Sequence, residues 1–110
     1  MAAVWFRDDE RGFAAWVEAN AEGFLVNAYY RPSPRYLVLH KVACPTFKGR
    51  SGFTAPQYSK LCSDSIDELL ATARRDVGAK AFSKICKRCF PLNVSVRRTD
   101  SLQPSLPPPD

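Results

Sequence analysis

The strongest constraint on this chain is a set of five side chains that can bind a soft metal ion, within only 110 residues. Cys86 and Cys89 form a Cys-x-x-Cys step, His40 and Cys44 lie four residues apart, and Cys62 stands alone. Zinc takes about four nitrogen or sulfur ligands in a tetrahedron, and a two-residue gap lets two thiolates of one tight turn reach the same ion. The pattern predicts one structural Zn²⁺ ion that joins distant segments of a small fold.

Three other uses of the cysteines compete with zinc. Disulfides suit an oxidising compartment, but the first residues carry charges where a secretory signal needs an apolar run of about 7–15 residues, so we expect a cytoplasmic protein. A thioredoxin-like redox pair needs its Cys-x-x-Cys at a strand-to-helix junction, whereas Cys86 and Cys89 follow the clearest helix pattern. In the third alternative the cysteines are unrelated apolar residues, since Cys44, Cys62 and Cys86 have apolar neighbours.

The apolar pattern predicts an α+β fold that begins with a helix. Asp8 or Asp9 can cap this helix, with Trp5 and Phe6 before it as a hydrophobic staple. The segment that ends at Gly23 would stop it. Its apolar positions follow helical spacing and are Phe13, Trp16 and Val17.

Residues 24–30 and 36–42 are rich in β-branched and aromatic residues and predict an antiparallel hairpin. The connection between them, Arg-Pro-Ser-Pro-Arg, breaks both helix and strand and would hold Arg31 and Arg35 at the tip. Residues 57–62 predict a third short strand, which would make a small three-stranded sheet.

A second helix is predicted after this strand. Ser65 and Glu68 form a capping box, and Gly78 supplies the left-handed terminator. One face of this helix is apolar and consists of Ile66, Leu69, Leu70, Ala73 and Val77. The Cys-x-x-Cys knuckle follows, and residues 93–98 alternate in a way that predicts an edge strand.

The length suits one small domain, which we place at residues 1–98. Residues 99–110 contain four prolines and two leucines, and they predict a disordered tail. No apolar run approaches the roughly 20 residues that a membrane-spanning helix requires, so no membrane association is expected.

The choice between His40 and Cys62 as the fourth ligand depends on the third strand. If this strand runs antiparallel to the second, Cys62 lies roughly 17–20 Å from Cys44, and the following helix brings Cys86 and Cys89 back toward Cys44. A parallel third strand, or residues 79–85 extended back along the helix, would instead bring in Cys62 and leave out His40. We favour His40, Cys44, Cys86 and Cys89, although a thiolate before a helix N-terminus, as at Cys62, is electrostatically stabilised.

Enzymatic chemistry is not expected. A closed four-ligand zinc site has no open coordination position. The chain has a single histidine, and if His40 binds the metal, no histidine remains as a general base. The chain contains no nucleotide-binding glycine motif and no nucleophile elbow.

Charge indicates the kind of partner. Sixteen Lys and Arg against eleven acids give a net charge of +5, and residues 31–60 and 79–98 contain no acid. One basic face would suit phosphate contacts, with interleaved aromatics for stacking on bases. The predicted nucleic-acid-binding residues are Arg31, Arg35, Lys48, Arg50, Phe53, Tyr58, Lys87 and Arg88.

DNA is favoured over RNA as the nucleic acid. The alternative is a protein-interaction or regulatory module that binds a partner protein through exposed aromatics such as Trp5, Phe6 and Phe47.

The segments 23–27, 36–44 and 58–62, a helix, and then Cys86-x-x-Cys89-x-Pro91 resemble a pattern found in small bacterial domains. The resemblance covers residues 13–91 and implies that these segments form one unit. It implies neither an activity nor a ligand set. Zinc ribbons and treble clefs differ, because they usually place a knuckle before the hairpin, and here the Cys-x-x-Cys comes last.

Overall fold

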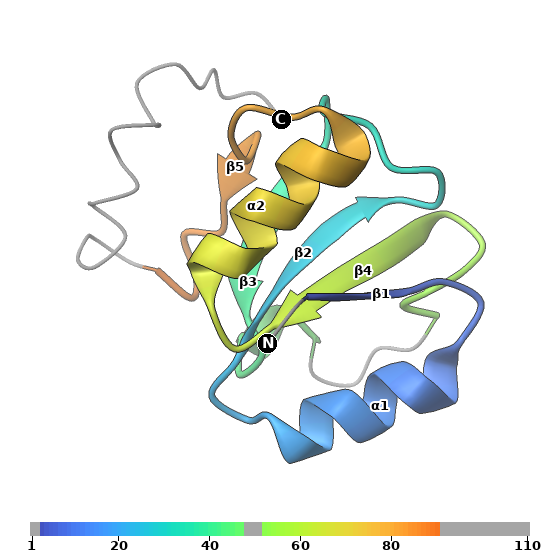
Figure 1. Ribbon diagram of the computed structural model, residues 1–110. Helices are drawn as coiled ribbons and strands as arrows, with labels where there is room; N and C mark the ends of the chain where they lie inside the picture. The colour runs from blue at the N-terminus through green and yellow to red at the C-terminus, as the bar shows by residue number, and fades with distance from the viewer. Residues whose placement is uncertain (1–2, 48–51, 91–110) are drawn as a thin grey trace.

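The computed structural model describes residues 3–47 and 52–90 and shows an α+β fold of two helices and a five-stranded mixed sheet (Figure 1). The α+β class predicted from the sequence is confirmed. The predicted strand at residues 93–98 and the Pro-rich tail lie outside the described residues. The elements are β1 (Val4–Phe6), α1 (Glu10–Ala19), β2 (Phe24–Tyr29), β3 (Leu37–Lys41), a 3₁₀ turn η1 (Pro45–Phe47), β4 (Tyr58–Ser63), α2 (Ile66–Val77) and β5 (Lys84–Ile85).

The sheet has the strand order β1-β4-β2-β3-β5. The predicted hairpin is present as β2 and β3, which pair antiparallel with Leu25 opposite His40 and Asn27 opposite Val38. Strand β2 also pairs antiparallel with β4 along its whole length, so it lies at the centre of the sheet. The cross-strand pairs place Leu25, His40 and Cys62 in one row on one face.

The favoured direction of the third strand, antiparallel to the second strand, is wrong. Strand β4 lies on the far side of β2 from β3, and because both are antiparallel to β2, they run in the same direction. The prediction set this strand against β3, whereas the apolar strand β2 pairs along both of its edges. The expected consequence of a parallel strand, that Cys62 replaces His40, does not follow either. Cys62 and His40 lie in the same cross-strand row, but β2 stands between their strands, so two inter-strand spacings, about 10 Å, separate them.

Two short edge strands were not predicted. Strand β1 pairs antiparallel with β4 and β5 pairs parallel with β3. The three-residue strand β1 contains Trp5 and Phe6, which were predicted to form a hydrophobic staple before the first helix. Phe6 does contact Phe13 of α1, with ring centroids 5.9 Å apart. The indole N–H of Trp5 instead donates to Asp76 Oδ2 of α2 at 2.9 Å.

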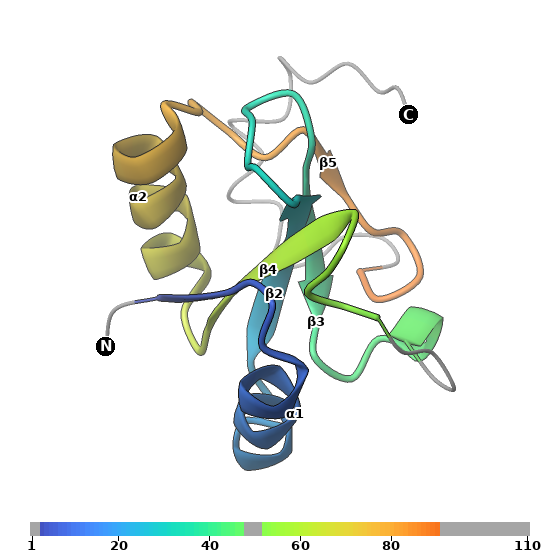
Figure 2. The same cartoon turned by 90° about the vertical axis from the view of Figure 1, so that its right-hand side faces the viewer.

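Helix α2 covers one face of the sheet (Figures 1 and 2). The predicted caps are confirmed: Ser65 Oγ accepts from the Glu68 N–H at 3.2 Å, and Gly78 adopts φ 77°. Only a residue that tolerates this left-handed conformation ends a helix at low cost. The buried core on this face consists of Val26, Ala28, Leu37, Leu39, Leu61, Leu69, Ala73, Ala79 and Phe82.

Helix α1 and residues 52–57 lie against the other face, which we call the pocket face (Figure 2). Asp9, the residue before α1, accepts a hydrogen bond from the Gly12 N–H at 2.8 Å and is the cap. A second core packs here around Phe6, Phe13, Leu25 and Cys62. Helix α1 covers only one end of this face, and the rest of it forms the floor of a pocket.

Candidate metal centre and the adjoining pocket

The four favoured metal-binding residues come together at one corner of the sheet. His40 lies in β3 and Cys44 in the turn after it, where the Cys44 N–H donates to the Lys41 carbonyl at 3.0 Å. Cys86 follows β5, and its N–H donates to the Leu39 carbonyl at 2.9 Å. Parallel pairing of β5 with β3 thus brings the Cys-x-x-Cys turn beside His40.

The donor atoms have the spacing of a tetrahedral site. One ligand atom from each of His40, Cys44, Cys86 and Cys89 can be chosen so that all lie within 4.8 Å of one another. The Cys44 and Cys86 sulfurs are 3.8 Å apart, and Cys89 Sγ is 3.9 Å from His40 Nδ1. Zinc–sulfur bonds of about 2.3 Å in a tetrahedron give sulfur–sulfur edges of about 3.8 Å. The cluster therefore fits one four-coordinate ion.

Burial favours the uncharged forms of His40 and Cys89 when no ion is bound. Desolvation, with smaller effects of Lys60 and Lys84, lowers the pKa of His40 to about 4, and the neutral imidazole is the form that binds metals. Desolvation also raises the pKa of Cys89, and hydrogen bonds with Cys44 and Cys86 add to this effect. A bound cation would favour the thiolate over the neutral thiol, because a thiol that coordinates a metal ion is deprotonated outright.

Backbone contacts support the thiolate form of one ligand. The Lys41 N–H donates to Cys89 Sγ at 3.4 Å, and this bond lowers the pKa of Cys89 against the larger effect of burial. The four cysteines, all within the described residues, form no disulfide, although the sulfurs of Cys44 and Cys86 lie close together. Three thiols and one imidazole form a donor set typical of zinc, and four protein ligands leave no open position for catalysis.

Cys62 does not join the cluster. It lies in β4 and is fully buried among Phe6, Phe13 and Leu25. Burial raises its pKa to about 12, although Lys60 lowers it slightly. Desolvation therefore outweighs any stabilisation of the thiolate by the N-terminus of α2, and Cys62 is a core residue.

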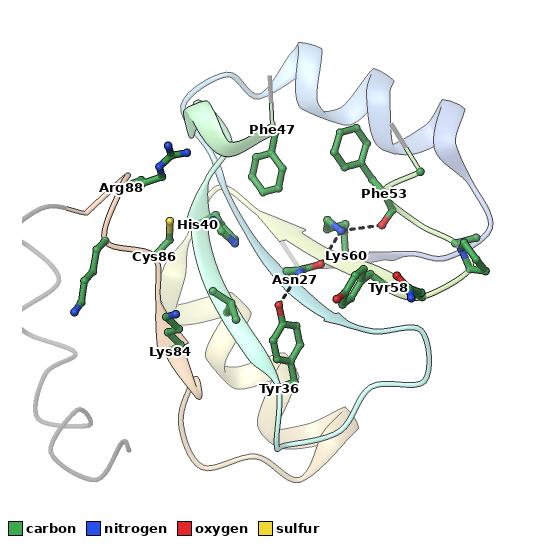
Figure 3. A pocket seen from close by; sticks show the side chains of 16 residues that line it. Asn27, Tyr36, His40, Phe47, Phe53, Tyr58, Lys60, Lys84, Cys86 and Arg88 are labelled. Carbon is green, nitrogen blue, oxygen red and sulfur yellow. Dashed lines mark hydrogen bonds between the residues drawn. The ribbon is translucent and has the colours of Figure 1, made fainter. Parts of the chain in front are cut away.

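A pocket of about 680 Å³ opens on the pocket face beside the cluster (Figure 3). His40 and Cys86 belong to both, so the candidate metal centre forms one wall of the pocket. Strand alternation supplies the floor, because Tyr36, Val38 and His40 point to the same side of the sheet as Asn27 and Lys60.

Half of the predicted nucleic-acid-binding residues line this pocket: Phe53, Tyr58, Lys87 and Arg88. Arg31 and Arg35 lie exposed in the β2–β3 connection and do not line it. Lys48 and Arg50 lie outside the described residues. Among the described residues, the predicted cations therefore lie at two places: Arg31 and Arg35 at the hairpin tip, and Lys87 and Arg88 at the pocket.

Two pocket residues, Asn27 and Lys60, were missed as site residues. Lys60 is buried, with 3% of its surface exposed, and its Nζ donates to Asn27 Oδ1 at 2.7 Å and to the Phe53 carbonyl at 2.8 Å. Asn27 Nδ2 donates to the Tyr36 hydroxyl at 3.2 Å. The sequence did contain a signal for both residues, because each is a polar side chain in the middle of a strand. A lysine at such a position is buried only when specific partners surround it.

The aromatics of the alternative, protein-binding interpretation are not exposed. Phe6 is buried, and Trp5 and Phe47 are partly buried. Within the described residues the large apolar side chains with high exposure are Val4 and Tyr29. Of the three aromatics named for that interpretation, Trp5 and Phe47 are thus partly accessible and Phe6 is not.

Comparison of the chain with family models, with curated proteins and with solved structures gave no match. Fold and site therefore define the protein by class: a small α+β protein with a candidate His-Cys₃ metal centre beside a basic and aromatic pocket. Within the described part of the chain, neither helix has the length and apolar character needed to cross a bilayer.

Proposed function

We propose that this protein is a non-catalytic, zinc-stabilised module that binds nucleic acid. The observation that carries the proposal is the position of Lys87 and Arg88. These two exposed cations lie between the candidate ligands Cys86 and Cys89, and both line the aromatic pocket. An ion at the cluster would therefore fix two phosphate-binding side chains beside rings that can stack on bases.

Zinc is the proposed ion because of the donor set. Three thiolates and an imidazole in a tetrahedron favour zinc over the hard cations, which prefer oxygen ligands. The closed coordination supports a structural role. His40, the only histidine of the chain, would be a ligand, which leaves no imidazole as a general base and argues against hydrolytic chemistry.

The charge of the pocket supports an anionic partner. Its lining includes four cations, Lys60, Lys84, Lys87 and Arg88, and no carboxylate. Cations that neutralise phosphates release condensed counterions, so binding to nucleic acid should weaken as salt increases. A short labelled single-stranded DNA and its duplex, titrated by fluorescence anisotropy from about 50 to 200 mM salt, provide the measurement.

A matched pair of variants tests the location of binding. The double variant Lys87→Ala/Arg88→Ala should bind more weakly, with a salt slope reduced by about 1–2 in magnitude. The double variant Arg74→Ala/Lys80→Ala removes the same charge from exposed positions that do not line the pocket, and it should bind nearly as the natural protein does. Equal weakening in both variants would show non-specific attraction to net charge and would contradict the proposal.

A partner protein remains the alternative outcome of one direct test. The tagged protein is captured from lysate with and without nuclease treatment. Loss of co-purified nucleic acid, and of proteins retained through it, supports the proposal. A stoichiometric protein partner that survives nuclease treatment would instead support a protein-interaction module.

A further inference from the structure

The pocket beside the metal cluster has an interior as well as a rim. Its volume of about 680 Å³ lies within the range of about 300–1,000 Å³ found for small-molecule sites. Phosphate contacts made only by surface cations do not require a hollow. The interior therefore has room for a ligand group beyond the phosphates at the rim.

The floor of the pocket is a buried polar network. Lys60 Nζ is held by Asn27 Oδ1 and the Phe53 carbonyl, and Asn27 in turn donates to Tyr36 (Figure 3). Burying the Lys60 ammonium group, in a residue with 3% exposure, is costly without hydrogen bonds. Its two acceptors offset this cost and leave a positive charge at the floor of the pocket. Such a group favours electron-rich acceptors, such as the carbonyl oxygens and ring nitrogens of a nucleobase.

The walls of the pocket are flat and aromatic. Lys60 Nζ lies 5.7 Å from the ring centroid of Phe53 and 5.6 Å from that of Tyr58. Tyr36 continues this wall, with its ring 5.9 Å from that of Tyr58. On the side nearer the metal cluster, Phe47 meets the His40 ring edge to face at 4.8 Å. Rings on both sides of a polar floor suit a planar heterocycle.

The rim carries the cations. Lys84, Lys87 and Arg88 are exposed and line the same pocket. Lys84 and Arg88 lie on the β5 side of the opening (Figure 3). A ligand that is planar and polar at one end and anionic at the other would match the floor, the walls and the rim together. A nucleotide has this division of chemistry.

We infer that the pocket accepts a single unpaired nucleotide, with its base over Lys60 and Asn27 and its phosphate at Lys84, Lys87 and Arg88. The inference deepens the proposed function and rests on it where the nucleotide belongs to a nucleic acid strand. In paired duplex the base faces are stacked and unavailable, so the protein should prefer single strands. A free nucleoside monophosphate presents the same chemistry and is the other source.

The experiment compares three probes on the zinc-loaded full chain: a labelled single-stranded oligonucleotide, its duplex, and unlabelled nucleoside monophosphates as competitors. We expect the single strand to bind about tenfold or more tightly than the duplex. Tyr58→Ala, which removes a stacking ring, should weaken single-strand binding by about tenfold. Tyr30→Ala, a tyrosine that does not line the pocket, is the matched control and should leave binding unchanged.

A second variant tests the floor independently of the walls. Lys60→Met keeps a long, unbranched side chain and removes its charge. It should reduce single-strand affinity while circular dichroism shows an intact fold. If Tyr58→Ala fails to fold, Lys60→Met and the monophosphate competition still decide whether the pocket binds a nucleotide.

The outcomes separate the two proposals. Equal binding of single strand and duplex, unaffected by Tyr58→Ala and Lys60→Met, would overturn this inference and leave nucleic-acid binding standing. Binding of monophosphates without binding of either oligonucleotide would support the pocket assignment and overturn the proposed function. Binding of no probe would overturn both.

Discussion

At the scale of single residues, the four cysteines show how environment decides the role of one side chain. Cys44 and Cys62 are both fully or nearly fully buried thiols. Cys44 lies 3.8 Å from a second thiol, whereas Cys62 is surrounded by Phe6, Phe13 and Leu25. A cation at Cys44 would therefore find further ligand atoms nearby, whereas a cation at Cys62 would find none among the described residues.

This difference gives a matched prediction. Cys44→Ala should lose the bound metal, because three remaining ligands hold zinc far less tightly. Cys62→Ala should retain about one zinc per chain and lose about 1–2 kcal/mol of stability through the small cavity. Metal analysis of protein purified without chelator, with urea unfolding of the same samples, measures both effects.

Two results would contradict the assignment. Metal retained by Cys44→Ala would exclude the His-Cys₃ set, and metal lost from Cys62→Ala would place Cys62 in the coordination sphere. Because the change of side chain is identical in the two variants, a general effect of losing a thiol cannot explain a difference between them.

The sequence allowed the candidate ligands to be named because their spacings are local. The Cys-x-x-Cys step and the pair His40 and Cys44 each lie within one turn or strand end. The choice of His40 over Cys62 depended on the direction of the third strand relative to the second, and the direction assumed for it was wrong. Asn27 and Lys60 were missed because their contact joins positions 33 residues apart on different strands.

At the scale of elements, a strong local sequence pattern was sufficient to predict a helix, whereas the shortest strands have no such pattern. Helix α2 has the predicted N-cap at Ser65, a regular apolar face and a glycine terminator. The predicted capping box is only half formed, because the Ser65 N–H donates to Ser63 Oγ and not to the Glu68 side chain. Strands β1 and β5 contain three and two residues. Segments this short carry no readable periodicity, and their pairing with β4 and β3 is decided by the assembled sheet.

Helix α1 holds the wall of the pocket through one carboxylate. Glu10 Oε1 accepts from the Phe53 N–H at 3.0 Å, and Oε2 accepts from the Thr54 hydroxyl at 2.7 Å. Desolvation raises the pKa of Glu10, but the hydrogen bonds from Thr54 and Phe53 outweigh it and lower the pKa below its ordinary value of 4.5. The ionised carboxylate therefore orders the segment that carries Phe53.

Glu10→Gln should destabilise the protein by about 1 kcal/mol at neutral pH, at the low end for charged hydrogen bonds because Glu10 is exposed to solvent. A lowered pKa in the folded state means that this contribution is present above about pH 4.5, the ordinary value, and is lost as the pH falls through the folded pKa. The measurement is urea unfolding of both proteins across this range, and the two curves should converge in acid.

Glu18→Gln is the control for the helix charge. Glu18 is exposed on α1, and this substitution should change stability by no more than about 0.5 kcal/mol. A Glu10→Gln effect that stays constant down to low pH would show that its ionised form is not what holds residues 53–54.

At the scale of the whole molecule, the candidate metal centre stands apart from both apolar cores. One core packs under α2 and the other under α1, while the cluster forms a third group with Val38 at the corner where β3 and β5 meet. An ion there would join the end of the hairpin to the last described turn. It would also connect the fold to function, because the Cys-x-x-Cys turn presents Lys87 and Arg88 to the pocket.

Removal of the metal should therefore loosen one corner before the rest of the fold. Strand β5 is held to β3 by few hydrogen bonds, including those from the Ser83 and Cys86 N–H groups to Leu37 and Leu39, each at 2.9 Å. When free zinc exceeds its dissociation constant about a thousandfold, binding adds about 4 kcal/mol of stability that chelation withdraws. We expect chelator to lower the melting temperature and to abolish hydrogen-exchange protection at the Cys86 amide first.

The amide of Val26, in the central strand and within the core under α2, is the internal control. Its protection should fall only as far as global stability falls, because its neighbours β3 and β4 do not depend on the ion for pairing. Unchanged melting and unchanged protection at Cys86 in strong chelator would show that the corner is stable without metal. The four buried donors would then form a thiol-rich core, and Lys87 and Arg88 would have no ion to fix their position.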